Sequence, residues 1–90
     1  MLLAVDIGNT NIVLGLFDGV GEDAPLVHHR RMRTDARMTA DEMALTFRGL
    51  LGDYANKITG ICALSTVPAV LRELRVMLDH YWPHLPRIIV

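Results

Sequence analysis

The chain has 90 residues, of which 51% are apolar and 21% are charged, and its formal net charge at pH 7 is −1. This length and this balance are typical of one small globular domain and exclude an intrinsically disordered chain. The near-neutral charge gives no general attraction to nucleic acid or to an anionic membrane surface.

The first predicted elements are two strands joined by a short turn. The apolar run Leu2–Asp6 predicts a strand that is buried on both faces. Glycine and asparagine accept the backbone conformations of tight turns, so residues 8–11 (Gly-Asn-Thr-Asn) predict a turn. The following run, Ile12–Phe17, then predicts a second strand.

A third strand is predicted after a longer connection. Asp18 and Gly19 indicate a tight turn, and Val20–Ala24 a loop. The next run, Leu26–Arg33, is more polar than the first two strands, so we expect it near an edge of the sheet.

The first helix has a clear beginning and end. Thr39 followed by Glu42 fits a capping box, in which each side chain accepts a hydrogen bond from the other residue's backbone. Gly52 is a suitable stop. The predicted apolar face of this helix comprises Met43, Phe47, Leu50 and Leu51.

The second half of the chain alternates between strand and helix. Ile58–Leu64 predicts a fully buried strand, and Pro68 suits the first turn of a second helix. The core face predicted for that helix comprises Leu71, Leu74, Leu78 and Tyr81. Pro83 and Pro86 end the helix, and Arg87–Val90 begins another strand. Since the sequence stops at a strand, we expect it to be truncated there.

The resulting order, β-β-β-α-β-α-β, predicts an α/β domain with a mixed sheet flanked by helices. Several features favour a cytoplasmic protein. The N-terminus has no basic region before its apolar run, which argues against a signal peptide, and uncharged runs such as Ile7–Phe17 fall well short of the ~20 apolar residues of a membrane span. The single cysteine, Cys62, excludes an internal disulfide and is expected to be a small buried hydrophobe.

The turn after the first strand is the strongest candidate site. Asp6 is the only charged residue among the first seventeen, and a carboxylate buried in a strand needs a basic partner, backbone donors or a divalent cation. The backbone and the short polar side chains of Gly8, Asn9, Thr10 and Asn11 suit an anion-binding concavity, and a neighbouring carboxylate can hold Mg²⁺. An ordinary hairpin turn, in which Asp6 accepts from turn amides, is the alternative.

The segment from Leu3 to Gly19, Leu-Ala-Val-Asp-Ile-Gly-Asn-Thr-Asn-Ile-Val-Leu-Gly-Leu-Phe-Asp-Gly, resembles the opening of type III pantothenate kinases. Those enzymes belong to the superfamily of actin, acetate kinase and sugar kinases, which has a ribonuclease H-like fold and a phosphate loop that begins with an acidic residue. The predicted element order matches their half-domain. Residues 65–68 (Ser-Thr-Val-Pro) also resemble a Ser-x-Val-Pro segment of the family.

The resemblance implies a set of site residues. The implied ATP-binding segment is Asp6, Ile7, Gly8, Asn9, Thr10, Asn11, Ile12 and Val13. By the same resemblance Asp6 positions Mg²⁺ and the terminal phosphates, and the turn contacts phosphate oxygens. Ser65 and Thr66 follow a predicted strand, where they either line the same cleft or serve as helix N-caps.

The resemblance also implies a reaction. Type III pantothenate kinases transfer the γ-phosphoryl group of ATP to the primary hydroxyl of pantothenate, which is the first step of coenzyme A biosynthesis. They require Mg²⁺ and a monovalent cation, K⁺ or NH₄⁺, and they form homodimers. Their catalytic base lies in a Gly-x-Asp-Arg motif of a second lobe, which we expect beyond residue 90. Residues 1–90 are then an N-terminal ATPase-like lobe that contains no catalytic residue.

Two other functions stay open at this point. The chain is alternatively a non-catalytic nucleotide-binding or transcription-accessory module, or part of another small-molecule kinase of the superfamily. The basic cluster Arg30, Arg31, Arg33 and Arg37 is either a solvated strand edge or a contact for an anion or a partner. No aromatic residues interleave with these arginines to suggest base stacking, so we expect no nucleic-acid partner.

Overall fold

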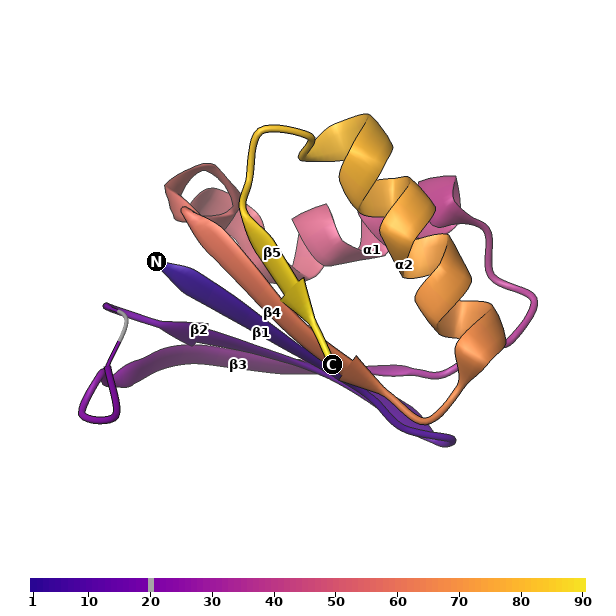
Figure 1. Cartoon of the computed structure of the whole chain (residues 1–90), viewed down its shortest axis with the longest axis horizontal. Coiled ribbons are helices and arrows are strands. Elements are labelled where there is room, and N and C mark those ends of the chain that lie inside the picture. The colour runs from indigo at the N-terminus through magenta and orange to yellow at the C-terminus, as the bar shows by residue number, and fades with distance from the viewer. Residues whose placement is uncertain (20) are drawn as a thin grey trace.

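The computed structural model describes residues 1–19 and 21–90 as a five-stranded sheet with helices on one face (Figure 1). The elements are β1 (Leu2–Ile7), β2 (Asn11–Phe17), β3 (Leu26–Arg33), α1 (Ala40–Leu51), the 3₁₀ helix η1 (Gly52–Lys57), β4 (Gly60–Ser65), α2 (Pro68–Tyr81) and β5 (Arg87–Ile89). The predicted order is confirmed, with η1 added after the first helix. Of the predicted loop at 20–24, Val20 lies outside the described residues.

The sheet is mixed, in the order β3-β2-β1-β4-β5. The pairs β1–β2 and β2–β3 are antiparallel, whereas β1–β4 and β4–β5 are parallel. Parallel neighbours need a crossover connection, which α1 provides between the meander and β4 and α2 provides between β4 and β5. The predicted edge position of β3 is confirmed, and β1 lies at the centre of the sheet.

The first helix begins and ends as its sequence predicts. The Thr39 hydroxyl accepts a hydrogen bond from the backbone N–H of Glu42, and the Glu42 carboxylate accepts one from the backbone N–H of Thr39. At the other end Gly52 has a φ of 57°, a backbone conformation that favours glycine, and its N–H donates to the carbonyl of Arg48. Of the predicted apolar face only Leu50 is half-buried rather than buried.

The core face of α2 differs from the prediction. Its buried residues are Val70, Leu74, Met77 and Leu78. These positions follow the spacing i, i+4, i+7, i+8, which places them on one side of the helix. The predicted residues Leu71 and Tyr81 lie beside this face and are only half-buried. The Tyr81 hydroxyl instead donates to Asp41 Oδ1 at 2.8 Å, which joins α2 to α1. This hydrogen bond raises the pKa of Tyr81.

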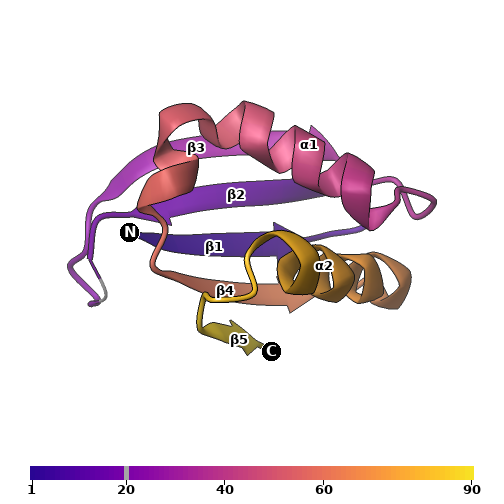
Figure 2. The same ribbon diagram turned by 90° about the horizontal axis from the view of Figure 1, so that it is seen from above.

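The two helices cover the same face of the sheet, with α1 above β3 and α2 above β4 (Figure 2). The prediction that β1 and β4 are buried on both faces is therefore wrong. On the other face, called here the open face, Asp6 is exposed, Leu64 is 47% exposed and Cys62 is half-buried. Side chains alternate along a strand, and within the described chain only one of the two sets meets a helix.

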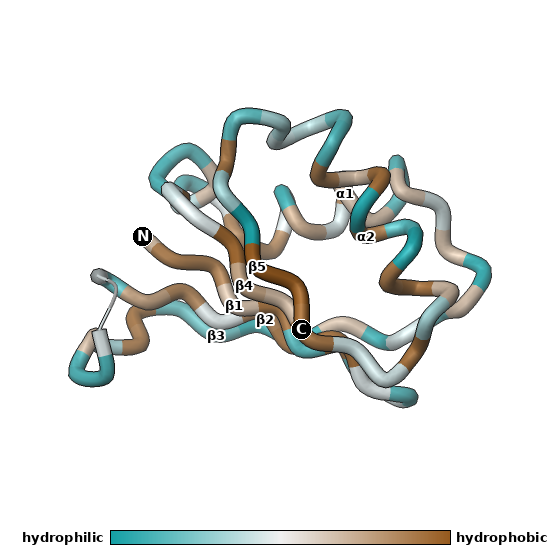
Figure 3. The backbone as a smooth tube through the Cα atoms, in the orientation of Figure 1, coloured by the Kyte–Doolittle hydropathy of each residue, from teal (hydrophilic) through white to brown (hydrophobic). Residues whose placement is uncertain are grey.

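The hydrophobic core lies between the helix-covered face and the two α-helices. Ile7, Ile12, Phe47 and Leu74 are fully buried in it, and no buried polar side chain is present among the described residues. The sheet strands around this core are mostly apolar, whereas the edge strand β3 carries a hydrophilic stretch (Figure 3). Among residues 1–19 and 21–90, neither helix combines the length and the apolar composition needed to cross a bilayer.

The capping box gives a test of the fold with a matched control on one helix. We expect Thr39→Ala to lower the free energy of unfolding by about 1 kcal/mol, because the first turn of α1 loses its side-chain acceptor. Thr46→Ala removes a hydroxyl that donates to the Glu42 carbonyl within the same helix, and should be neutral or slightly stabilising. Urea unfolding followed by circular dichroism measures both; equal losses would contradict the capping geometry.

Candidate functional site

The turn between β1 and β2 is a tight hairpin closed by its own backbone. The Gly8 N–H donates to the Asn11 carbonyl at 2.9 Å. A Cβ added to Gly8 would lie 3.3 Å from that same oxygen, which is closer than side chains normally approach. Glycine therefore lets the chain turn back tightly at this position.

The segments that follow the two neighbouring strands hold this hairpin from both sides. After β3, the backbone N–H of Thr34 donates to the Thr10 carbonyl at 2.9 Å, and the Thr34 hydroxyl donates to the Gly8 carbonyl at 2.7 Å. After β4, the backbone N–H of Thr66 donates to the Ile7 carbonyl at 3.1 Å. Sequence reasoning missed Thr34. The antiparallel register, which pairs Arg33 with Asn11, is the signal that locates it beside the turn.

The residues of the predicted ATP-binding segment divide between the two faces. Ile7 and Ile12 are fully buried in the core, so only their backbone atoms can meet a ligand. Asn9 and Thr10 are exposed at the tip of the turn, and their N–H groups donate to no backbone carbonyl of the described chain. Val13 is half-buried on the open face. The tip thus offers backbone and side-chain donors to an anion.

The carboxylate of Asp6 is exposed on the open face, so the expectation that the strand buries it is wrong. Its β1 position pairs with Val13 on one side and Leu64 on the other. Within residues 1–19 and 21–90, this carboxylate accepts no hydrogen bond and joins no salt bridge. The absence of bonds to the turn amides disfavours the ordinary-hairpin interpretation, in which Asp6 has that role.

The donor set beside the turn fits Mg²⁺ held mainly by phosphate oxygens and water. In the part of the chain that the structure describes, no three His, Cys, Asp or Glu side chains gather into a group that holds a metal by itself. Mg²⁺ commonly takes one or two carboxylates, with substrate phosphates and water completing its six ligands. Asp6, with no other bond, is suited to supply one such carboxylate.

A shallow apolar hollow of about 220 Å³ adjoins Asp6 on the open face. It exists because one row across the sheet has small side chains, with Gly15, Ala4 and Cys62 in neighbouring register positions. Cys62 is therefore a half-buried lining residue of the open face rather than the buried hydrophobe expected. The hollow is smaller than the ~300–1,000 Å³ typical of ligand pockets.

The interpretation of Ser65 and Thr66 as helix N-caps is wrong. The N-cap of α2 is Val67, which makes no side-chain capping bond. The Ser65 hydroxyl instead accepts from the Val67 N–H at 2.9 Å, within a local turn. Thr66 lies beside the hairpin through its bond to the Ile7 carbonyl. The end of β4 therefore reaches the same end of the sheet as the turn.

A larger hollow, of about 510 Å³, lies away from the turn, between β3 and the end of α1. It is lined in part by His28, Arg30, Tyr54 and Lys57. His28 lies on the helix side, where its Nε2 is 2.9 Å from the Leu50 carbonyl oxygen, whereas His29 lines the hollow on the open face. The two histidines therefore point to opposite faces of the sheet. No residue of the predicted ATP-binding segment lines this larger hollow.

Comparison with known sequences identifies a family. A sequence model of the family "Type III pantothenate kinase" matches residues 2–90. Proteins named type III pantothenate kinase from Rhodococcus opacus and Rhodococcus erythropolis are 68% and 67% identical to this chain over all 90 of its residues. Each match covers 33% of the relative, so the chain spans about a third of the length of the curated relatives it matches.

Comparison with solved structures identifies the fold. A Porphyromonas gingivalis protein named as an N-acetylglucosamine kinase matches with a TM-score of 0.68 and 19% identity, over 100% of this chain and 33% of that one. Thermus thermophilus RuvC matches with a TM-score of 0.60 and 17% identity, over 99% of this chain and 62% of that one. These similarities confirm the predicted ribonuclease H-like fold of the actin type, with its mixed five-stranded sheet.

The bond from Thr34 to Gly8 gives a test of how the turn is held. We expect Thr34→Val to accelerate amide hydrogen exchange at residues 8–11 and to lower the free energy of unfolding by about 1 kcal/mol, because the Gly8 carbonyl loses its side-chain donor. Thr46→Val removes a hydroxyl far from the turn and should leave exchange there unchanged. Unaltered exchange at residues 8–11 in Thr34→Val would show that the turn does not depend on this bond.

Proposed function

This chain belongs to the type III pantothenate kinase family, and we propose that it supplies the phosphate-binding lobe of an ATP-dependent pantothenate kinase. In the proposed reaction the γ-phosphoryl group of ATP passes to the primary hydroxyl of pantothenate and gives 4′-phosphopantothenate, the first step of coenzyme A biosynthesis. The names of the relatives support the kinase class and the substrate. As the chain spans a third of their length, the complete reaction is assigned to a longer protein that contains this segment.

One observation carries the proposal for this lobe: an exposed carboxylate with no other bond lies next to a hairpin that is fixed by its neighbours. Asp6 stands at the end of the central strand, and the turn at residues 8–11 is bonded to Thr34. A site that is rigid before the ligand arrives loses little conformational entropy on binding. Phosphoryl transfer depends mostly on positioning and on charge stabilisation, which a rigid site favours.

The proposed roles follow from where each group lies. The carboxylate of Asp6 orients Mg²⁺ directly or through water, and the ion neutralises charge on the β- and γ-phosphates when bound. The N–H groups of Asn9 and Thr10, together with their side chains and that of Asn11, donate to phosphate oxygens. Ile7 and Ile12 contribute backbone atoms and anchor the turn to the core, and Val13 lies beneath the phosphates.

The remaining parts of the activity are proposed for the rest of the family's length. These are the catalytic base, the monovalent cation site for K⁺ or NH₄⁺, the pantothenate pocket and the homodimer contact. A cytoplasmic location is proposed for the protein, consistent with a small-molecule kinase. The alternative is a non-catalytic nucleotide-binding module, and it differs from the kinase in that a longer protein carrying this segment would contain no Gly-x-Asp-Arg sequence.

A titration with Mg–ATP tests the proposal. We expect saturable changes in the backbone amide NMR signals of residues 8–11, and we expect Asp6→Asn to weaken the binding of ATP about tenfold in the presence of Mg²⁺. Without Mg²⁺ the two proteins should differ little, because the carboxylate acts through the ion. In a longer protein that carries this segment, the same substitution should abolish phosphorylation of pantothenate.

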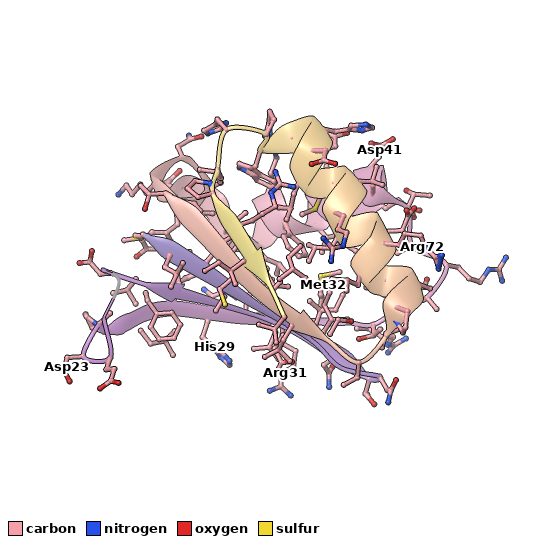
Figure 4. All side chains as sticks on the ribbon, in the orientation of Figure 1. Asp23, His29, Arg31, Met32, Asp41 and Arg72 are labelled. Atoms are coloured by element: carbon pink, nitrogen blue, oxygen red, sulfur yellow. The ribbon has the colours of Figure 1, made fainter. Side chains whose placement is uncertain are left out.

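Asp23→Asn is the matched control, since it makes the same change in charge on the turn between β2 and β3 (Figure 4). Equal affinities of Asp6→Asn and the unchanged chain in Mg²⁺ would remove Asp6 from the site. Binding of ATP by the longer protein without phosphorylation of pantothenate would instead support the non-catalytic module.

A further inference from the structure

Two arginines of the edge strand β3 lie on the same face of the sheet as Asp6. Arg31 pairs with Val13 of β2, and Val13 pairs in turn with Asp6 of β1. Met32 is buried on the helix side, and since side chains alternate along a strand, Arg31 and Arg33 face the other way. Figure 4 shows Arg31 and Met32 on opposite sides of the sheet.

The register sets the width of the gap between these charges. Adjacent strands are about 4.8 Å apart, so the Cα atoms of Arg31 and Asp6 are about 10 Å apart across the intervening β2. The side chain of Val13 forms the floor between them. Arg33 pairs with Asn11, the last residue of the turn, and so flanks the phosphate-binding segment itself. A phosphate group fits in this gap, within reach of a long side chain from the β3 flank.

The charges on this face are not neutralised by each other. Asp6 is the only charged residue among the first seventeen, so the turn has no basic side chain of its own. Within the described ranges 1–19 and 21–90, neither Arg31 nor Arg33 donates a side-chain hydrogen bond or forms a salt bridge; the salt bridge there joins Arg87 and Asp79. A polyphosphate that approaches a lone carboxylate is repelled, and two guanidinium groups on the opposite flank offset this repulsion.

We propose that Arg31 and Arg33 bind the terminal phosphate oxygens of the nucleotide from the β3 flank, opposite Asp6. A guanidinium group presents parallel N–H donors whose geometry matches two phosphate oxygens, which makes it better suited to this role than an ammonium group. The inference rests on the proposed function of the turn and adds β3 to the site. It separates the basic cluster into two phosphate-binding arginines and a remainder that is exposed to solvent.

The strand itself provides the control. Arg30 immediately precedes Arg31 in the sequence but lines the hollow beside α1 on the helix side, where its Nη1 donates to the His29 carbonyl. We expect Arg31→Gln and Arg33→Gln each to weaken binding of Mg–ATP and of Mg–tripolyphosphate about five- to tenfold, and Arg30→Gln to change it by less than about twofold. Arg31→Lys, which keeps the charge but loses the paired donors, should bind with intermediate affinity.

A second measurement needs no substitution. In the unchanged chain, saturating Mg–tripolyphosphate should shift the Nε–Hε signals of Arg31 and Arg33 and leave that of Arg30 in place. Equal losses of affinity in all three Gln variants would overturn the inference in favour of a diffuse basic field, as would unshifted Arg31 and Arg33 signals while the amides of residues 8–11 respond. That last result would leave the function of the turn intact. No saturable binding by the unchanged chain would overturn both proposals.

Discussion

The hydrogen bonding of β1 on both of its edges is the constraint on which the rest of the structure depends. It pairs antiparallel with β2 and parallel with β4, so each backbone group along it is held by a neighbouring strand. Its C-terminal end therefore has a fixed position at the middle of the sheet. The turn that follows is therefore anchored at its start, and hydrogen bonds from Thr34 and Thr66 hold it on either side. A binding turn at the edge of the sheet would have such support from one side only.

The one-sided packing of the sheet explains how a carboxylate is tolerated in its central strand. A charged group that is buried without a partner costs several kcal/mol, and the same group exposed to water costs little. Asp6 alternates with Val5 and Ile7, whose side chains enter the core, and so points to the open face. The strand therefore combines two tasks: one set of side chains stabilises the fold, and the other set is available for chemistry.

Local signals in the sequence predict most of the fold. The capping box at Thr39 and the glycine stop at Gly52 depend on neighbouring residues alone, and both are confirmed. The sequence wrongly predicts burial of the open face, because an apolar run has the same pattern whether one or both faces of its strand are covered. The predicted core face of α2 includes Leu71, whereas the buried residue is its neighbour Val70. Both side chains are apolar, so the sequence pattern does not distinguish them. The sequence alone does not identify Thr34 as a residue of the site, because its position beside the turn depends on the register between β2 and β3.

The topology has a consequence for the order in which the molecule forms during synthesis. The turn, both of its strands and Thr34 all lie within the first 34 residues, as two successive antiparallel pairings. Contacts between residues close in sequence form with less loss of chain entropy than the pairing of β1 with β4, which joins Leu2 to Gly60. The meander also leaves the ribosome before α1, β4 and α2 do. We therefore expect the turn to form early, at a stage when the apolar side of β1 and β2 is not yet covered by α1 and α2. That interval is when the nascent chain is most exposed to aggregation, and when a chaperone has the most apolar surface to bind.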